Sequence, residues 1–315
     1  PDVLVYNPSA RVRGPLIELD PFAVQQAVQV TALGAFFASQ EAARRMVHTN
    51  HGAILLTGAS GFLGQAITAE AVRRHHHVRA LLRPTSDVPA ALAEGGEQVE
   101  IVRAELKDGD ALRAAVRGVD AVIHAASAMH GSLEQQMAGT VTATEELLAA
   151  LKACDVKRFV LVGSFSVYDY LGLESGACLD EESPLEPEPE RRHAYCQTKL
   201  AQDRLVRRAG DEQGLAWTIL RSGPIIGVGR TLVSRLGQRI GGAWLRIGAH
   251  ALVPLTYVEN CADAVVGAAE NDAAVGQVLN VVDDDLPTQA EYLLSLIHIS
   301  EPTRPFTLSR MPSSA

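Results

Sequence analysis

The 315-residue chain has little positive charge, no long apolar run and no recognisable leader. Lysine and arginine number 28 against 37 aspartates and glutamates, and the net charge of −9 provides no basic field for nucleic acid. No apolar stretch reaches the length that spans a membrane, and no charged-then-apolar segment marks secretion. These absences predict a cytoplasmic protein that binds neither nucleic acid nor membrane.

Cysteine is also scarce, and none of the four cysteines belongs to a CxxC pair. Zinc sites and the disulfide frameworks of small domains need such spacing, so the sequence predicts neither. The three consecutive histidines at residues 75–77 are not read as a metal site, because adjacent side chains cannot all face one ion. No metal is expected, and 47% hydrophobic residues suffice for a sizeable core.

What the chain does contain is a glycine-rich stretch at residues 54–64, where an apolar strand runs into Gly58, Gly61 and Gly64. Glycine allows the sharp turn, lets the backbone approach a pyrophosphate and permits close packing of the next helix. Residues 65–74 have helical composition, and the start of a helix presents free N–H groups to phosphates. With a strand before it and a helix after it, the pattern predicts a dinucleotide site.

A second signal is the pair Tyr195 and Lys199, which are four positions apart. On a helix this spacing puts both side chains on one face. A phenol with its ordinary pKa near 10 is a poor base at neutral pH, and a neighbouring ammonium favours the phenolate. The alternative is an exposed helical tyrosine beside a lysine, but together with the glycine loop the pair indicates acid/base chemistry.

A third signal is Ser164, which follows an apolar, strand-like run at residues 158–163. In an open α/β sheet, ligands bind at the carboxyl ends of the strands, although many serines in such loops only form turns. Strand-like segments near residues 53, 77, 99, 120, 158 and 216 alternate with helical ones. This alternation predicts an α/β fold with a doubly wound parallel sheet of the Rossmann type.

With these motifs in this order, residues 52–293 resemble the extended short-chain dehydrogenase/reductase family, the NAD(P)-dependent epimerase/dehydratase group. Residues 57–64 are similar to its TGxxGxxG motif, and residues 118–126 to its strand beside the nicotinamide ribose. Residues 220–227 are similar to its Leu-Arg-Pro-Gly segment, with Ser222 in place of proline. The resemblance implies an enzyme that transfers hydride to or from a hydroxyl or carbonyl of a nucleotide sugar or similar small molecule.

The resemblance also implies roles for individual residues. Tyr195 would exchange a proton with the substrate oxygen, Ser164 would hydrogen-bond that oxygen, and Lys199 would hold the nicotinamide ribose and lower the pKa of the tyrosine. The residues implied for the cofactor, besides Tyr195 and Lys199, are Thr57, Gly58, Ser60, Gly61, Phe62, Leu63, Gly64, Arg83, Glu105, Leu106, Ala125 and Ala126.

The choice of cofactor can be read at the end of the second strand. Enzymes that prefer NAD place an acid there for the ribose hydroxyls, but this chain has Leu82, followed by Arg83. An arginine can bind a ribose phosphate through paired hydrogen bonds. The sequence therefore favours NADP, with NAD as the alternative.

Three functions remain open at this point. Residues 78–86 resemble dihydroflavonol-reductase-like and hydroxysteroid-dehydrogenase-like members, which indicates an NADPH-dependent carbonyl reductase, whereas the acidic, proline-rich residues 179–189 resemble nucleotide-sugar epimerases. Dehydration is set aside, because residues 164–166 read Ser-Phe-Ser where dehydratases carry acids. A nucleotide-sensing binding protein without turnover is the third, and Tyr195 with Lys199 argues against it.

The two ends of the chain do not fit the extended family. Residues 1–52 resemble an internal fragment of a classical short-chain dehydrogenase, with a strand at residues 2–6 and a long helix at about residues 22–47. Two explanations are open: a natural N-terminal extension, or a join of two genes during sequence assembly that would make the chain a metagenomic chimera. Residues 294–315 resemble a translated sequencing adapter.

Four parts are therefore expected: an extra segment at 1–52, an NAD(P)-binding domain at 53–221, an incomplete substrate-binding part at 222–293 and an artefactual tail at 294–315. Family members often pair through helices, so a homodimer is a further expectation, although the N-terminal segment could obstruct that surface.

Overall fold

The computed structural model describes residues 12–33, 36–37, 52–174, 176–231, 238–240, 243–245 and 250–300, and the chain forms two compact units, Pro1–Gly52 and Ala53–Ala315. In the first unit, a 3-10 turn at Leu16–Glu18 precedes helix α1 (Pro21–Val28), which continues as a π-helical turn over Gln29–Leu33. Asp20 caps α1 by accepting a hydrogen bond from the Phe22 N–H at 3.0 Å. The predicted strand at residues 2–6 and most of the second half of the predicted helix lie outside the described residues.

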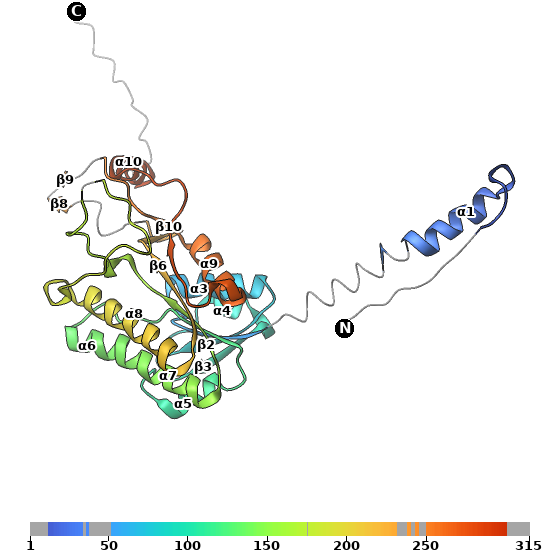
Figure 1. The fold of residues 1–315 in the computed structure, drawn as a ribbon. Coiled ribbons are helices and arrows are strands. Elements are labelled where there is room, and N and C mark those ends of the chain that lie inside the picture. The colour runs from blue at the N-terminus through green and yellow to red at the C-terminus, as the bar shows by residue number, and fades with distance from the viewer. Residues whose placement is uncertain are drawn as a thin grey trace, which may run out of the picture. The chain divides into compact units, whose positions relative to one another are not determined.

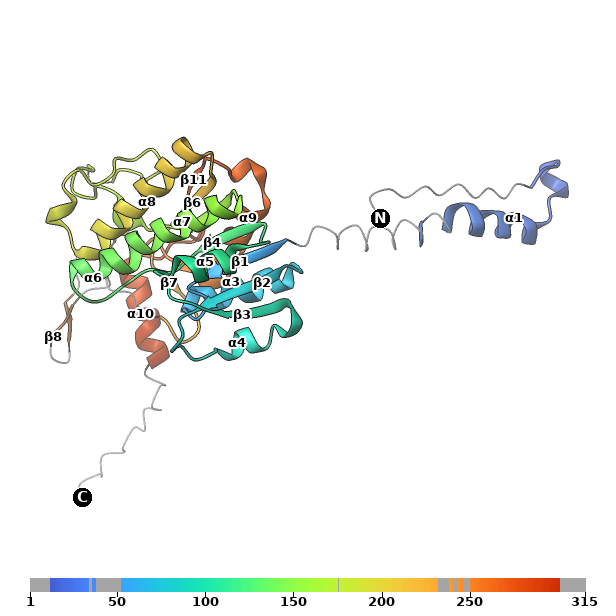
Figure 2. The same cartoon turned by 90° about the horizontal axis from the view of Figure 1, so that it is seen from below.

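The second unit is built on a parallel sheet of seven strands in the order β11-β6-β5-β4-β1-β2-β3 (Figure 1; Figure 2). Their bounds are β1 Ala53–Thr57, β2 His77–Leu82, β3 Val99–Arg103, β4 Ala121–His124, β5 Arg158–Val162, β6 Ala216–Ser222 and β11 Val278–Val281. The predicted doubly wound α/β sheet is thus confirmed. The strand order reverses between β1 and β4, and this is the point where such sheets bind their ligands.

Helices cover both faces of the sheet (Figure 1). The helices of this unit are α3 Phe62–Arg73, α4 Ala90–Ala93, α5 Gly109–Val116, α6 Leu133–Met137, α7 Ala143–Cys154, α8 Ala194–Gln213, α9 Val258–Glu270 and α10 Gln289–Ser300. On one face α3 and α9 bury Ile67 and Val265 against the sheet. On the other, α5, α7 and α8 bury Leu112, Leu147 and Val206. Strands β1 and β4 are apolar up to their last residues, Thr57 and His124, because both of their faces are covered.

Residues after β6 contribute to two parts of this unit. Strand β7 (Ile225–Ile226) pairs with β10 (Thr256–Tyr257), and β8 (Gln238–Ile240) pairs with β9 (Ala243–Leu245). Strand β11, in contrast, pairs with β6 in the main sheet, and α9 packs on α3. Part of the range predicted as the substrate-binding part therefore belongs to the central layers. Among the described residues, none of the helices combines the length and apolar character that a membrane span requires.

Candidate active site

The glycine-rich loop joins β1 to α3 at the centre of the sheet. Gly58 has a φ of +74°, and a Cβ there would lie 2.8 Å from the backbone of Ala125 and Ala126, which follow β4. A Cβ on Gly64 would collide with the Gly58 carbonyl oxygen. Gly61 is the N-cap of α3, and no side chain caps the helix there. A close-packed turn with uncapped N–H groups fits the pyrophosphate of a dinucleotide.

Thr57 lies inside the sheet, whereas Ser60 lies in the glycine loop. The Thr57 side chain is fully buried, and its hydroxyl lies 2.6 Å from Nδ1 of His124. It therefore faces the interior of the sheet, while its backbone carbonyl accepts from the Ala125 N–H at 3.2 Å. The Ser60 carbonyl accepts from the side chain of Gln65 at 3.1 Å, which ties the loop to the first turn of α3.

The ends of β2 and β3 lie beside this loop on the same edge of the sheet. Arg83 is exposed just after β2. Arg103, the last residue of β3, binds the backbone of the turn that contains Arg83. The Arg103 guanidinium donates to the carbonyls of Arg83, Pro84 and Ser86 at 3.3, 3.0 and 2.7 Å. The sequence prediction missed Arg103. An arginine that ends a strand next to Arg83 was the available signal.

Glu105 and Leu106 follow β3 and have different environments. Glu105 is exposed at the sheet edge, whereas Leu106 packs against the apolar cluster between the sheet and α5. Of these two residues predicted for the cofactor, the glutamate is exposed and the leucine is only partly exposed.

The predicted catalytic serine and tyrosine come from two neighbouring elements. Ser164 follows β5 and caps a 3-10 turn (Phe165–Val167), accepting from the Ser166 N–H at 3.1 Å. Tyr195 is the second residue of α8. Burial raises the pKa of the Tyr195 phenol, and interaction with the Ser164 hydroxyl and the Arg230 guanidinium acts in the opposite direction. The two side chains are thus near enough to influence each other.

Lys199 lies one turn further along α8 and is buried. Its ammonium donates to the Val162 carbonyl at 2.8 Å and to Oε1 of Gln202 at 2.5 Å. Burial lowers the pKa of Lys199 to about 8, while the Asp203 carboxylate acts to raise it. The groups that oppose the raised pKa of Tyr195 are Ser164 and Arg230. The effect of Lys199 on this pKa stays a prediction.

Two side chains near Tyr195 were not found from the sequence. His193 caps α8 by accepting from the Cys196 N–H at 3.2 Å, and its ring stacks on that of Tyr195 with centroids 6.3 Å apart. Arg230 follows the short strand β7 and lies 5.3 Å from the centre of the Phe62 ring. His193 could have been noticed as a capping residue two positions before the tyrosine. Arg230 carries no local signal, because only the tertiary fold brings it to α8.

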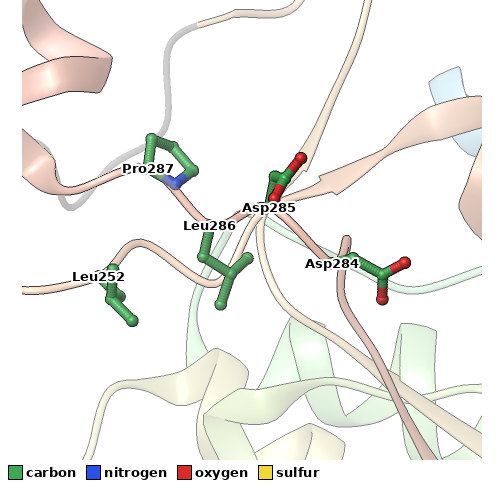
Figure 3. A pocket seen from close by; sticks show the side chains of 5 residues that line it. All are labelled: Leu252, Asp284, Asp285, Leu286 and Pro287. Carbon is green, nitrogen blue, oxygen red and sulfur yellow. The ribbon is translucent and has the colours of Figure 1, made fainter.

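A pocket of about 480 Å³ opens elsewhere, at Leu252 and the turn from Asp284 to Pro287 (Figure 3). None of the residues predicted for catalysis or for the cofactor lines it, and the two aspartates point away from each other. In the part of the chain that the structure describes, no group of three or more histidine, cysteine or acidic side chains could hold a metal ion. The candidate active site therefore lies at the carboxyl ends of β1 and β5, where the glycine loop, Ser164 and Tyr195 of α8 are found.

Comparisons with known proteins agree with this architecture. The model of the NAD dependent epimerase/dehydratase family matches residues 54–281. A solved structure of UDP-glucuronic acid 4-epimerase from Bacillus cereus, in complex with NAD, superposes with a TM-score of 0.62 at 22% identity, covering 78% of this chain and 82% of that one. At this identity the likeness concerns the fold.

Curated relatives add information on chemistry. A 3 beta-hydroxysteroid dehydrogenase/Delta 5→4-isomerase from Mycobacterium tuberculosis is 28% identical over 275 residues, which are 83% of this chain and 69% of that protein. A 2-alkyl-3-oxoalkanoate reductase from Stenotrophomonas maltophilia is 34% identical over 215 residues, 66% of this chain and 62% of that protein. Both relatives are named for the oxidation of a hydroxyl group or the reduction of a ketone.

Proposed function

The chain belongs to the NAD dependent epimerase/dehydratase family of NAD(P)-dependent enzymes, and from this premise we propose that it interconverts a secondary alcohol and a ketone of a small molecule. The observation that carries the proposal is the approach of Ser164 to Tyr195 at the same sheet edge as the glycine loop. The names of the two curated relatives support this reaction over epimerisation.

The cofactor, when bound, supplies or accepts the hydride. Tyr195 donates its proton to the carbonyl oxygen during reduction and takes it back from the hydroxyl during oxidation, and the Ser164 hydroxyl holds the same oxygen. Because burial raises the pKa of Tyr195, its phenol is protonated at neutral pH. We therefore expect reduction to be favoured near neutral pH and oxidation to accelerate as the pH rises.

The experiment is to follow NADPH and NADH oxidation with a panel of ketosteroids, 3-oxoalkanoates and UDP-sugars. We expect stoichiometric loss of the reduced cofactor with a ketone. The Tyr195→Phe variant should lose about 10²- to 10⁴-fold in kcat while it still binds the dinucleotide. Tyr257→Phe, in the short strand β10, is the matched control and should keep full activity. A Tyr195→Phe enzyme with undiminished turnover would refute the mechanism.

Epimerisation of a nucleotide sugar is the second candidate, favoured by the acidic segment at residues 179–189. This segment packs beside the turn that follows Ser164, since the Glu186 N–H donates to the Val167 carbonyl at 2.9 Å and Tyr168 pairs with Leu185. An epimerase returns its hydride, so a UDP-sugar converted to its epimer without net cofactor consumption would favour this candidate over the reductase.

We also propose that the preferred cofactor is NADP. Arg83 supports this, because it is exposed at the end of β2 and its side chain has no hydrogen bond or ion pair among the described residues. Arg83→Ala should raise the KM for NADPH about tenfold and leave that for NADH unchanged. Arg117→Ala, between the end of α5 and the start of β4, controls for the loss of a positive charge. Equal effects on both cofactors would contradict the proposal.

A further inference from the structure

A line of buried polar side chains connects the glycine loop to Lys199. Its members are Thr57, His124, Thr144, Gln202 and Lys199, and none is more than 3% exposed. They come from four different elements: β1, β4, α7 and α8. Buried polar groups need partners, so the hydrogen bonds along this line constrain one another.

The donor and the acceptor of each hydrogen bond along this line follow from the single hydroxyl proton of Thr144. Its hydroxyl donates to the Thr140 carbonyl at 2.6 Å, so its oxygen can only accept from its other neighbours. One of these is Nε2 of His124 at 2.9 Å. His124 must then carry its proton on Nε2, and its Nδ1 accepts from the Thr57 hydroxyl at 2.6 Å. A neutral ring agrees with the pKa of His124, which burial lowers to about 3.

The same count fixes the amide of Gln202. Its Nε2 donates to the Thr144 oxygen at 2.8 Å, so Oε1 is the atom that faces the Lys199 ammonium at 2.5 Å. A flipped amide would place its oxygen against an oxygen that has no proton to give, and its NH₂ against the ammonium. Gln202 is therefore held as an acceptor for Lys199.

Lys199 has three N–H donors, and two of them are used by the Val162 carbonyl and Gln202. The third has no acceptor among the described residues of the chain. The charged or titratable groups around this ammonium are His124 from β4 and Asp203 from α8, and Asp203 is paired with Arg221 from β6.

We propose that Gln202, oriented by Thr144 and His124, is a positioning residue that holds Lys199 with its third N–H available to the nicotinamide ribose. The proposal rests on the proposed function, because it requires that the chain bind a dinucleotide. It adds to the serine, tyrosine and lysine three buried side chains, Gln202, Thr144 and His124, that act through the lysine.

The test is the affinity for NADPH, measured by fluorescence titration between pH 7 and pH 10. Binding should weaken as Lys199 loses its proton, with a midpoint near the pKa of about 8. Gln202→Met removes the acceptor, destabilises the ammonium and should move the midpoint down by about one unit. Gln202→Glu adds a negative charge and should move it up by about one unit. Tyr195 does not interfere, because its pKa is raised above the ordinary value of 10.0.

Shifts of the pH midpoint in opposite directions for Gln202→Met and Gln202→Glu would show that Gln202 positions Lys199. A general loss of stability would not produce them. Thr218→Val is the matched control, because it removes a buried hydrogen bond, 2.7 Å from the Thr218 hydroxyl in β6 to the Ala274 carbonyl, that involves neither Lys199 nor Gln202. It should lower the melting temperature and leave the pH midpoint unchanged. If the Gln202 variants fold poorly, Thr144→Val frees the Gln202 amide and should shift the midpoint in the direction of Gln202→Met.

Two results would overturn the inference while the proposed function stands: a pH-independent affinity for NADPH in the unmodified protein, or Gln202 variants that keep its midpoint or shift it in the same direction. An unmodified protein that binds neither NADPH nor NADH would instead refute the proposed function, and the role of Gln202 with it.

Discussion

Glycine positions in this fold differ in whether a side chain could be tolerated. Gly64, in the first turn of α3, has the Gly58 carbonyl oxygen and the Ala59 Cα where its Cβ would be. Both are backbone atoms, so the loop would have to open to make room. Gly267 lies inside α9, and the nearest atom to its Cβ would be a nitrogen of Arg74 at 3.7 Å. The first glycine is required by close packing, whereas the second is not.

We therefore expect Gly64→Ala and Gly267→Ala to have opposite effects. Gly64→Ala should abolish NADPH binding and destabilise the protein by about 1–3 kcal/mol through overpacking. Gly267→Ala should leave binding unchanged and stabilise α9 by up to about 1 kcal/mol. Melting temperatures and NADPH titrations of both variants provide the check. Unimpaired binding by Gly64→Ala would mean that the loop is not the phosphate site.

At the scale of elements, a buried ion pair connects β6 to α8. The Arg221 guanidinium, which is fully buried, donates twice to one oxygen of Asp203 at 3.0 Å. It also stacks 4.7 Å from the centre of the Tyr168 ring, whose hydroxyl donates to Asn280 in β11 at 2.7 Å. The helix that carries Tyr195 and Lys199 is thus attached to the sheet by charge as well as by apolar packing.

Removing one partner of this pair should be costly. Asp203→Asn leaves the Arg221 charge buried without a counter-charge, and we expect a loss of about 3–5 kcal/mol in the free energy of unfolding. Asp110→Asn breaks the exposed pair of Asp110 and Arg113 on α5 and should cost less than about 1 kcal/mol. Urea denaturation measures both, and similar midpoints for the two variants would show that burial does not matter here.

For the whole molecule, two buried bases contribute to the dependence of stability on pH. The pKa of His124 is lowered to about 3 and that of Lys199 to about 8, in both cases mainly by burial. In each window between the lowered and the ordinary pKa, the unfolded chain binds a proton that the folded chain does not. The contribution of His124 to stability therefore falls as the pH drops from 6.5 towards 3, and the contribution of Lys199 rises as the pH increases from about 8 to 10.5.

The contribution of Lys199 to stability at alkaline pH can be isolated with a variant. The stability difference between the unmodified protein and Lys199→Met should increase by up to about 3 kcal/mol between pH 8 and pH 10.5, in favour of the unmodified protein. Urea denaturation at several pH values gives this difference. Lys152→Met, at an exposed position of α7, serves as the control. A difference that does not change with pH would show that Lys199 titrates normally.

The strands were predictable from the sequence because an apolar run between turn residues is a local signal. All six predicted strands of the sheet, from β1 to β6, lie near the expected positions, and the glycine loop joins β1 to α3 as expected. The pairing of β11 with β6 and the contacts among His124, Thr144 and Gln202 were not predictable. They depend on tertiary packing between residues far apart in the chain, and no local pattern marks a histidine that will share a threonine hydroxyl with a glutamine 78 positions later.

The position of β1 in the middle of the sheet has a consequence for biosynthesis. Its neighbour β4 comes 67 positions later, and at ribosomal rates of 5–20 residues per second this delay is roughly 3 to 13 seconds. During this time we expect Ile54, Leu55 and Leu56, which form β1 in the folded chain, to leave an apolar segment with an unpaired edge on the nascent chain. The strand that precedes the predicted phosphate loop is therefore where we expect a chaperone that recognises short extended apolar peptides to bind.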